Sequence, residues 1–305
     1  MEFRLLLSLS TLAFTLASEW NYEGQGPDYW IHEYPRCAGR LQSPIDIQES
    51  NAIYDSKLGN INFHNYEWPL YWNISNNGHT IIANQLYNES LTPYITGSDF
   101  LPGVKYHLQQ FHFHWGFNIY QGSEHHIDNK KFPLEIHLVH SSNLNETTVV
   151  AFVFQIDKED NEKIAALISE VGNEDSVSDF NVTKFSLSLL LPTKDLLEKD
   201  GYFRYMGSLT TPPCTEGVKW TVFRTKINIS EAQMNQFFKN EIEFNNREVQ
   251  QLNDRKLFIN VPNGQLSSTE SPDITSGQPP LTICRIFILT LIVHLIYFLL
   301  ESIDI

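Results

Sequence analysis

The chain has 305 residues and a formal net charge of −15, with 42% apolar and 19% charged residues. This composition is typical of a globular protein, excludes an intrinsically disordered chain, and allows one large domain or two small ones. The acidic balance argues against a nucleic-acid partner, since Lys and Arg must neutralise phosphates there, and against electrostatic attachment to anionic lipid.

An apolar run at the N-terminus, residues 5–17, follows Arg4 and precedes Ser18. This pattern predicts a secretory signal peptide over residues 1–17, and the alternative is a buried first helix. Five sequons for N-glycosylation agree with secretion. They begin at Asn73, Asn88, Asn145, Asn181 and Asn228.

Strand patterns dominate the middle of the chain. Residues 110–115 (QFHFHW) and 134–140 (LEIHLVH) alternate in side-chain type, and residues 149–156 form a continuous apolar run. Both patterns predict strands, as does the mixed segment 219–226.

Helical patterns are fewer. The amphipathic segment 162–171 ends before Gly172, residues 230–240 begin with Ser230 as a candidate N-cap, and residues 193–197 are a short candidate. The predicted fold class is therefore β-dominated α+β, with a single domain over residues 18–262 and short surface helices.

Beyond residue 262 the composition changes. Residues 263–276 are rich in Ser, Thr, Pro and Gly, which predicts a flexible stalk. The apolar run in residues 277–305 is short for a membrane span of about 20 residues, and no basic residue follows it. These features favour a glycosylphosphatidylinositol (GPI) anchor signal with attachment at Ser276. A transmembrane segment is the alternative, since the run extended back to Leu281 would be long enough.

The chain has three cysteines, of which Cys284 lies in the apolar tail. The secreted part then keeps one pair, Cys37 and Cys214. An even number of cysteines in a secreted domain predicts a disulfide between them.

Three histidines lie on two of the predicted strands. His112 and His114 share one face of the first strand, and His137 lies on the second. Three imidazoles with one open position predict a catalytic zinc site, the alternative being structural histidines. Gln110 can accept a hydrogen bond from His112, and Glu135 from His137, which would orient both rings.

Longer motifs resemble those of alpha-class carbonic anhydrases over nearly all of residues 19–262. They are SEH at 123–125 with EIH at 135–137, QSPIDI at 42–47, NNGH at 76–79, SLTTPPC at 208–214 and NNR at 245–247. The resemblance implies a large, mostly antiparallel twisted sheet, Zn2+ as cofactor, and the reversible hydration of carbon dioxide to bicarbonate and a proton.

The resemblance also implies roles for individual residues. Zinc hydroxide would attack carbon dioxide, Thr210 and Glu124 would orient that hydroxide, and His79 would shuttle the proton. The remaining roles are a ligand partner for His114 (the carbonyl of Asn245), a water chain (Tyr22 and Asn77) and substrate contacts (Val139, Val150, Leu209, Thr210, Thr211 and Trp220). His125 is expected to hydrogen-bond Tyr205 rather than to bind zinc.

The implied partners are carbon dioxide, bicarbonate and water, with sulfonamide-type inhibitors and a membrane held through the C-terminal anchor. The implied place is the extracellular face of the plasma membrane. One alternative is a non-catalytic binding or adhesion module on the same fold, and another is a zinc hydrolase acting on esters. Ile82 stands where a polar residue often lines the cavity, which predicts a more apolar mouth.

Overall fold

A computed structural model describes residues 20–261, except residue 25, residues 87–88 and residues 172–179. These residues belong to one compact unit, Met1–Gln265. The strands are β1 (Asp46–Ile47), β2 (Ile53–Tyr54), β3 (Ile61–His64), β4 (Pro69–Asn76), β5 (Ile81–Leu86), β6 (Tyr94–Gly97), β7 (Tyr106–Trp115), β8 (His126–Ile127), β9 (Leu134–Ser142), β10 (Thr147–Asp157), β11 (Phe180–Ser186), β12 (Tyr202–Ser208), β13 (Glu216–Phe223), β14 (Ile227–Ser230) and β15 (Phe258–Ile259).

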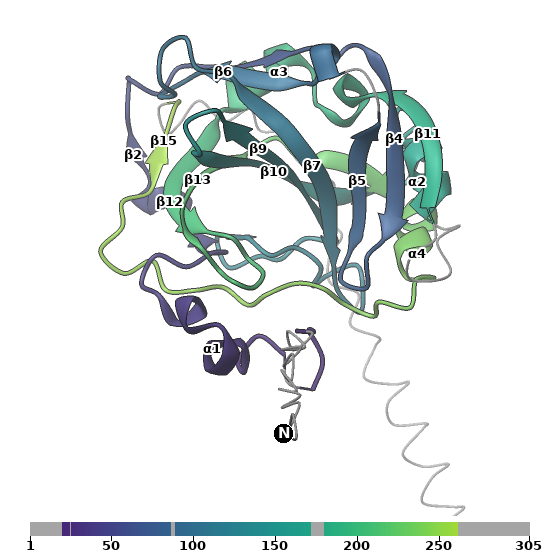
Figure 1. Ribbon diagram of the computed structural model, residues 1–305, viewed down its shortest axis with the longest axis horizontal. Coiled ribbons are helices and arrows are strands. Elements are labelled where there is room, and N and C mark those ends of the chain that lie inside the picture. The colour runs from purple at the N-terminus through teal and green to yellow at the C-terminus, as the bar shows by residue number, and fades with distance from the viewer. Residues whose placement is uncertain (1–19, 25, 87–88, 172–179, 262–305) are drawn as a thin grey trace, which may run out of the picture. The chain divides into compact units, whose positions relative to one another are not determined.

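Thirteen of these strands form one sheet, whose main path runs β11-β4-β5-β7-β9-β10-β13-β12-β15-β2. Most neighbours in it are antiparallel, and the parallel pairs are β10 with β13, β10 with β14, and β15 with β2. Figure 1 shows the strong twist of this sheet. The predicted fold class, a β-dominated domain on a large, mostly antiparallel twisted sheet, is therefore confirmed.

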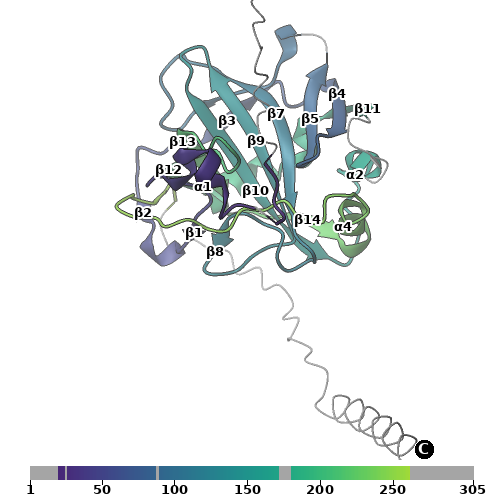
Figure 2. The ribbon, with the colours of Figure 1, turned by 60° about the horizontal axis from the view of Figure 1, so that its bottom comes forward.

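The helices are short and lie outside the sheet. They are α1 (Trp30–Glu33), α2 (Ala165–Val171), α3 (Lys194–Asp200) and α4 (Glu231–Phe237), with 3-10 turns at Pro35–Ala38, Glu49–Asn51, Glu89–Leu91 and Leu187–Leu190. Figures 1 and 2 both place α2 and α4 together at one end of the sheet. Among the described residues, no helix is both long and apolar enough to span a membrane.

Local signals in the sequence explain where these helices begin and end. Ser230 caps α4 through a capping box, because its hydroxyl accepts from the amide of Gln233 while the Gln233 side chain accepts from the amide of Ser230. The helix α2 begins three residues later than predicted, since Ile164 closes a turn on Asn161 first. The helix α3 continues past the predicted end to Asp200 and stops at Gly201, which has φ 73°.

The register of the sheet divides it into two faces. Directly paired residues point to the same side, and His137 of β9 pairs with His112 of β7 and with Ala151 of β10. Its neighbours Ile136 and Leu138 are fully buried on the opposite side, in the larger of the two main hydrophobic cores. The metal-binding candidates thus stand on one face, with a dense apolar core behind them.

The predicted glycosylation sites occupy different surroundings. Asn145 is exposed in the turn between β9 and β10. Asn228 is also exposed, but its amide group contacts both Asp157 and Gln155. Asn73 is half-buried on β4 and Asn181 lies on β11, whereas Asn88 lies outside the described residues.

The predicted signal peptide, stalk, anchor signal, Ser276 and Cys284 also lie outside the described residues. The glycosylation and anchoring assignments therefore stay predictions.

The predicted disulfide between Cys37 and Cys214 is confirmed, with the two Cα atoms 4.9 Å apart. Both cysteines are buried, and the bond joins the N-terminal segment to the turn that follows Thr210. Arg247 strengthens this junction, because its guanidinium donates to the carbonyl of Cys37 at 3.1 Å and to that of Ser43 at 2.9 Å.

Replacing Cys37 and Cys214 together by alanine is expected to lower the free energy of unfolding by about 2–5 kcal/mol. The bond spans a sequence separation of 177 residues, so its loss frees a long loop in the unfolded chain. Urea denaturation of a secreted form ending at Gln265 measures the change. The control is the same form with both cysteines present. Equal unfolding midpoints for parent and double variant would contradict this role.

Candidate metal centre

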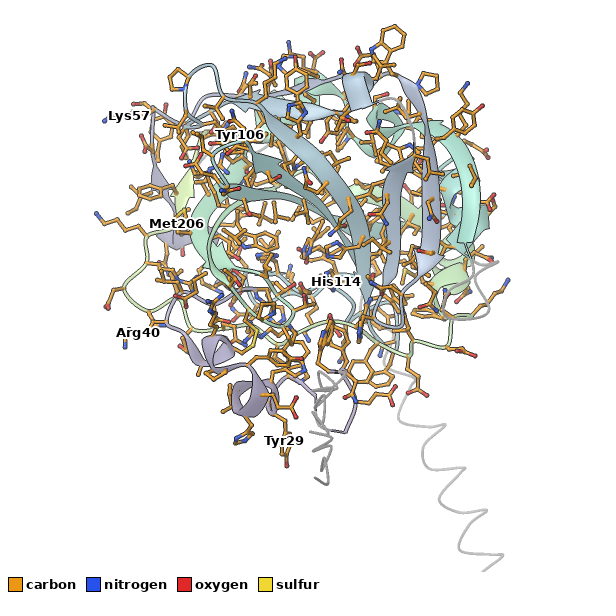
Figure 3. All side chains as sticks on the ribbon, in the orientation of Figure 1. Tyr29, Arg40, Lys57, Tyr106, His114 and Met206 are labelled. Carbon is orange, nitrogen blue, oxygen red and sulfur yellow. A yellow bond between two sulfur atoms is a disulfide. The ribbon has the colours of Figure 1, made fainter. Side chains whose placement is uncertain are left out.

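Strands β7 and β9 bring the three predicted ligands together. The ring centroid of His114 lies 4.9 Å from that of His112 and 4.5 Å from that of His137, and the three candidate ligand atoms lie within 4.8 Å of one another. Figure 3 shows His114 inside the molecule, whereas Tyr29 and Arg40 project from its surface. The alternation of side chains on both strands is the local reason that these rings converge.

Each histidine has one ring nitrogen fixed by a separate acceptor. His112 Nδ1 contacts Gln110 Oε1 at 2.8 Å, His114 Nδ1 contacts the carbonyl of Asn245 at 2.7 Å, and His137 Nε2 contacts Glu135 Oε1 at 2.7 Å. These contacts place the ring protons on the outer nitrogens, and they leave His112 Nε2, His114 Nε2 and His137 Nδ1 with free lone pairs. The predicted partners Gln110, Glu135 and Asn245 thus lie where they orient the ligands.

A further observation shows that the three histidines fit a zinc ion. His114 Nε2 is buried and, within the described part of the chain, has no hydrogen-bond partner. Burial lowers the pKa of His114 to about 3, and burial with neighbouring rings also lowers the pKa of His112. Neutral imidazoles are the form that binds metal, so these residues fit a three-histidine zinc site with one open position.

Glu135 contacts a second histidine besides the candidate ligand His137. Its Oε1 accepts from His137 and also from His125 Nδ1 at 2.6 Å, while its Oε2 accepts from the backbone amide of Glu124 at 2.9 Å. Burial acts to raise the pKa of the Glu135 carboxyl, but electrostatic attraction and hydrogen bonds from the His125 and His137 rings outweigh it and hold the pKa well below its usual range. His125 Nε2 lies 2.7 Å from Tyr205 Oη, so the predicted His125–Tyr205 contact is present. Because both ring nitrogens of His125 form hydrogen bonds, His125 is not free to bind metal.

Thr210 and Glu124 lie together beside the histidines, both buried. Burial raises the pKa of the Glu124 carboxyl well above its usual range, while hydrogen bonds from the Arg247 backbone and the Thr210 side chain act in the opposite direction. The Arg247 amide reaches Glu124 Oε1 at 3.0 Å. Glu124 also lies 3.4 Å from His114 Nδ1, so the predicted Thr210–Glu124 pair borders the metal centre.

His79 lies half-buried at the turn between β4 and β5. Asn77 Oδ1 accepts from the backbone amides of His79 and Thr80 at 3.0 and 2.9 Å, which fixes this turn. The imidazole stacks on the indole of Trp20, with centroids 3.7 Å apart. Asn77 therefore acts on the backbone of His79, in addition to the predicted role in a water chain.

The remaining predicted proton-path residue, Tyr22, is buried beside Trp30. Burial, followed by the charge of Glu124, raises the pKa of its phenol well above the ordinary value. Tyr22 therefore keeps its hydroxyl proton, and its role in a water chain stays a prediction.

One predicted substrate contact needs correction. Val150 pairs with Leu138 and faces the large core behind the sheet, whereas Val149 pairs with Val139 and with Trp220 on the metal face. Val149 therefore takes the place predicted for Val150 on the face of the three histidines. Val139, Leu209 and Trp220 pack in the same smaller core as Val149, and half-buried Thr211 follows Thr210 in the loop.

Sequence reasoning missed several supporting contacts. The side-chain amide of Asn245 donates to the carbonyls of His79 and Phe113, so this residue connects the turn that carries His79 to strand β7. The Trp20–His79 stack also went unpredicted. Ile82, expected to make the cavity mouth more apolar, pairs directly with His112 on the metal face.

Comparison with known proteins places this site in a family context. Residues 25–261 match the family model described as eukaryotic-type carbonic anhydrase. The chain is 33% identical over 267 residues to "Carbonic anhydrase 6" of Mus musculus, covering 80% of each chain. It is 32% identical over 305 residues to "Carbonic anhydrase 4" of Rattus norvegicus, covering 89% of this chain and 95% of the relative. It is 37% identical over 261 residues to "Carbonic anhydrase" of Klebsiella pneumoniae, covering 83% of this chain and 96% of the relative.

Proposed function

Because the chain belongs to the eukaryotic-type carbonic anhydrase family, we propose that it catalyses the zinc-dependent, reversible hydration of carbon dioxide to bicarbonate and a proton. The observation that carries this proposal is the convergence of three neutral histidines, each oriented by its own acceptor. Zinc held by His112, His114 and His137 would supply a hydroxide nucleophile at neutral pH.

Thr210 and Glu124 would orient the nucleophile. The Glu124 carboxyl accepts the Arg247 backbone amide, and its hydrogen bond with the Thr210 side chain would draw the hydroxyl proton of Thr210 towards it. With its proton so engaged, the Thr210 oxygen presents lone pairs and acts as an acceptor for the nucleophile. This arrangement selects one orientation of the attacking oxygen and lowers the entropic part of the barrier.

Carbon dioxide would occupy the apolar side of the site. Val139, Val149 and Trp220 share the metal face, and the Trp220 indole lies 4.8 Å from the His137 ring. The indole Nε1 donates to the carbonyl of Ser208 at 3.0 Å, so the ring presents an apolar surface to the substrate. A small apolar molecule binds such a surface without needing hydrogen bonds.

His79 would carry the product proton from the site to buffer. An imidazole is suited to this task because its ordinary pKa is about 6.5, close to neutral pH. The position of His79 at the rim is fixed by Asn77 and by the Asn245 side chain, which donates to the His79 carbonyl at 3.0 Å.

Replacing His79 by alanine is expected to lower kcat roughly tenfold in weak buffer, because proton export then limits turnover. Added imidazole should restore the rate by carrying the proton directly. The matched control is His32→Ala, since His32 lies on α1 outside the site. Stopped-flow hydration in weak and strong buffer makes the comparison, and equal rates for parent and His79→Ala in weak buffer would exclude the shuttle role.

We also propose an extracellular location with a GPI anchor at Ser276. The Cys37–Cys214 disulfide supports an oxidising compartment. The apolar tail and the small residues before it support lipid attachment.

Phospholipase C that cleaves GPI anchors is expected to release active protein from cells that express the full chain. The anchor would join lipid at Ser276 with removal of the tail, so an epitope added after Ile305 should be missing from the surface protein. Retention of the protein together with that epitope would show a transmembrane segment instead.

A direct assay separates the enzyme from a non-catalytic binding module on the same fold. The purified form ending at Gln265 should hydrate carbon dioxide and should be inhibited by a sulfonamide. A zinc-loaded protein with no activity above the uncatalysed rate would favour the binding module.

A further inference from the structure

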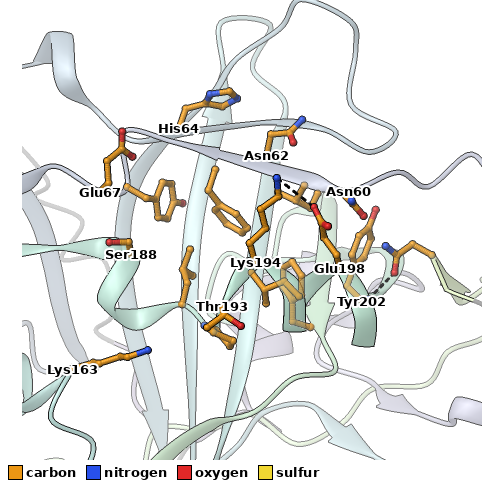
Figure 4. Close-up of a pocket in the computed structure, with 18 residues that line it drawn as sticks. Asn60, Asn62, His64, Glu67, Lys163, Ser188, Thr193, Lys194, Glu198 and Tyr202 are labelled. Carbon is orange, nitrogen blue, oxygen red and sulfur yellow. Dashed lines mark hydrogen bonds and ion pairs between the residues drawn. The ribbon is translucent and has the colours of Figure 1, made fainter. Parts of the chain in front are cut away.

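A cavity of about 530 Å³ lies between β3, the 3-10 turn Leu187–Leu190 and α3. This volume is typical of sites for small organic ligands. Figure 4 shows the cavity with its lining side chains.

The cavity is separate from the metal centre. Tyr202 and Phe223 line it and pair with each other, whereas the adjacent residue Val222 pairs with Ala151 on the face of His137. Successive residues of a strand point to opposite faces, so the cavity and the zinc ligands lie on opposite sides of the sheet.

The floor of the cavity is apolar. Phe63, Leu197 and Phe223 contribute hydrocarbon surface, and Phe223 is held by stacking on Phe152 with centroids 4.7 Å apart. The hydroxyls of the two lining tyrosines are already engaged: Tyr66 with His140 at 2.6 Å and Tyr202 with the carbonyl of Gly59 at 2.8 Å. The floor therefore offers ring faces rather than unpaired hydroxyls to a ligand.

The rim carries two lysines and two glutamates, and within the described residues only one of each forms an ion pair. Lys194 and Glu198 pair with each other at 3.6 Å. Lys163 has no ion pair within the described part of the chain, and Figure 4 shows its side chain extending from the lower margin of the cavity. The Glu67 carboxylate, which also forms no ion pair within the described residues, stands at the upper margin in the same view, at the opposite margin from Lys163.

We propose that this cavity binds a small amphipathic carboxylate, with its hydrocarbon part on the apolar floor and its carboxylate beside the ammonium of Lys163. Burying the hydrocarbon part supplies most of the affinity, because it removes apolar surface from water. The lysine then selects the anionic head group, because a carboxylate and an ammonium form a charge-assisted hydrogen bond. The proposal is independent of the hydration activity.

Three probes with the same chain and different head groups test it: octanoate, octanol and octylammonium. Each is titrated by calorimetry into the zinc-loaded form ending at Gln265, with the metal centre saturated by a sulfonamide so that the probe cannot bind there. Octanoate is expected to bind about threefold to tenfold more tightly than the other two. Equal affinity for all three, strongest binding of octylammonium, or no binding of octanoate would overturn the proposal.

Variants locate the binding. Lys163→Gln should weaken octanoate about threefold to tenfold and leave octanol unchanged, whereas Lys158→Gln, an exposed lysine outside the cavity, should change neither. Ser188→Trp places an indole in the cavity and should weaken octanoate at least tenfold, with Thr193→Trp as a second filling variant if the first unfolds. All variants should retain normal hydration rates, which shows that they fold. Unchanged octanoate affinity in folded Lys163→Gln and in a folded filling variant would place the probe elsewhere and overturn the proposal.

Discussion

Replacing His114 by alanine is expected to abolish zinc binding at stoichiometric concentration and to lower the hydration rate by roughly a thousandfold or more. His114 is buried at the centre of the cluster, and its Nε2 is an orphaned lone pair aimed at no other group of the described chain. Removing it leaves two ligands, which do not complete the three-ligand geometry of a catalytic zinc site.

The matched control lies on the same strand. His107 of β7 is outside the cluster, so His107→Ala should keep one zinc per chain and the parental rate. Zinc content by atomic emission and hydration by stopped flow are measured on both variants. A His114→Ala protein with parental zinc content and rate would show that the ligands have been assigned wrongly.

Replacing Thr210 by alanine is expected to lower kcat/KM about 100-fold while zinc content stays at one per chain. In the proposed mechanism its hydroxyl would link Glu124 to the nucleophile, and the substitution would remove this link without disturbing any contact of the three histidines. Added imidazole should not restore the rate, because proton export is not the step affected.

Two variants sharpen this test. Thr210→Ser keeps a hydroxyl and should recover most of kcat/KM. Thr215→Ala changes a threonine of the same loop whose hydroxyl contacts Arg36, and it should behave like the parent. If Thr210→Ala and Thr215→Ala lost the same small fraction of activity, Thr210 would have no orienting role.

The ligand strands were predictable because their pattern is physically simple. In β7 and β9, polar and apolar residues alternate, so a period of two assigns His112 and His114 to one face of β7 and separates His137 from the apolar residues beside it on β9. The helix cap at Ser230 follows a similar local rule. Longer motifs then added Thr210, Glu124 and His79, which no local periodicity relates to the histidines.

The prediction that Val150 contacts the substrate was wrong because strand β10 shows no such alternation. Strand β10 is buried on both faces and reads as a continuous apolar run, so nothing in its sequence marks which valine lies on the face of the three histidines. Only its pairing with Val139 and Trp220 shows that Val149 does.

Contacts between distant segments were equally inaccessible to sequence reasoning. The Asn245 side chain reaches His79 across a sequence separation of 166 residues, and Trp20 stacks on the same histidine. Such contacts depend on the complete fold, because neither partner carries a local signal for the other. The cavity beside Lys163 is likewise assembled from β3, α3 and β12–β13 segments.

A zinc titration of the metal-free protein tests the central claim most directly. The form ending at Gln265 is stripped with a chelator, and its hydration rate is measured as zinc is added back. A single buried three-histidine site predicts a rate that rises linearly and reaches a sharp plateau at one zinc per chain. Hydration that persists in the metal-free protein, or a rate that does not respond to zinc, would contradict the account.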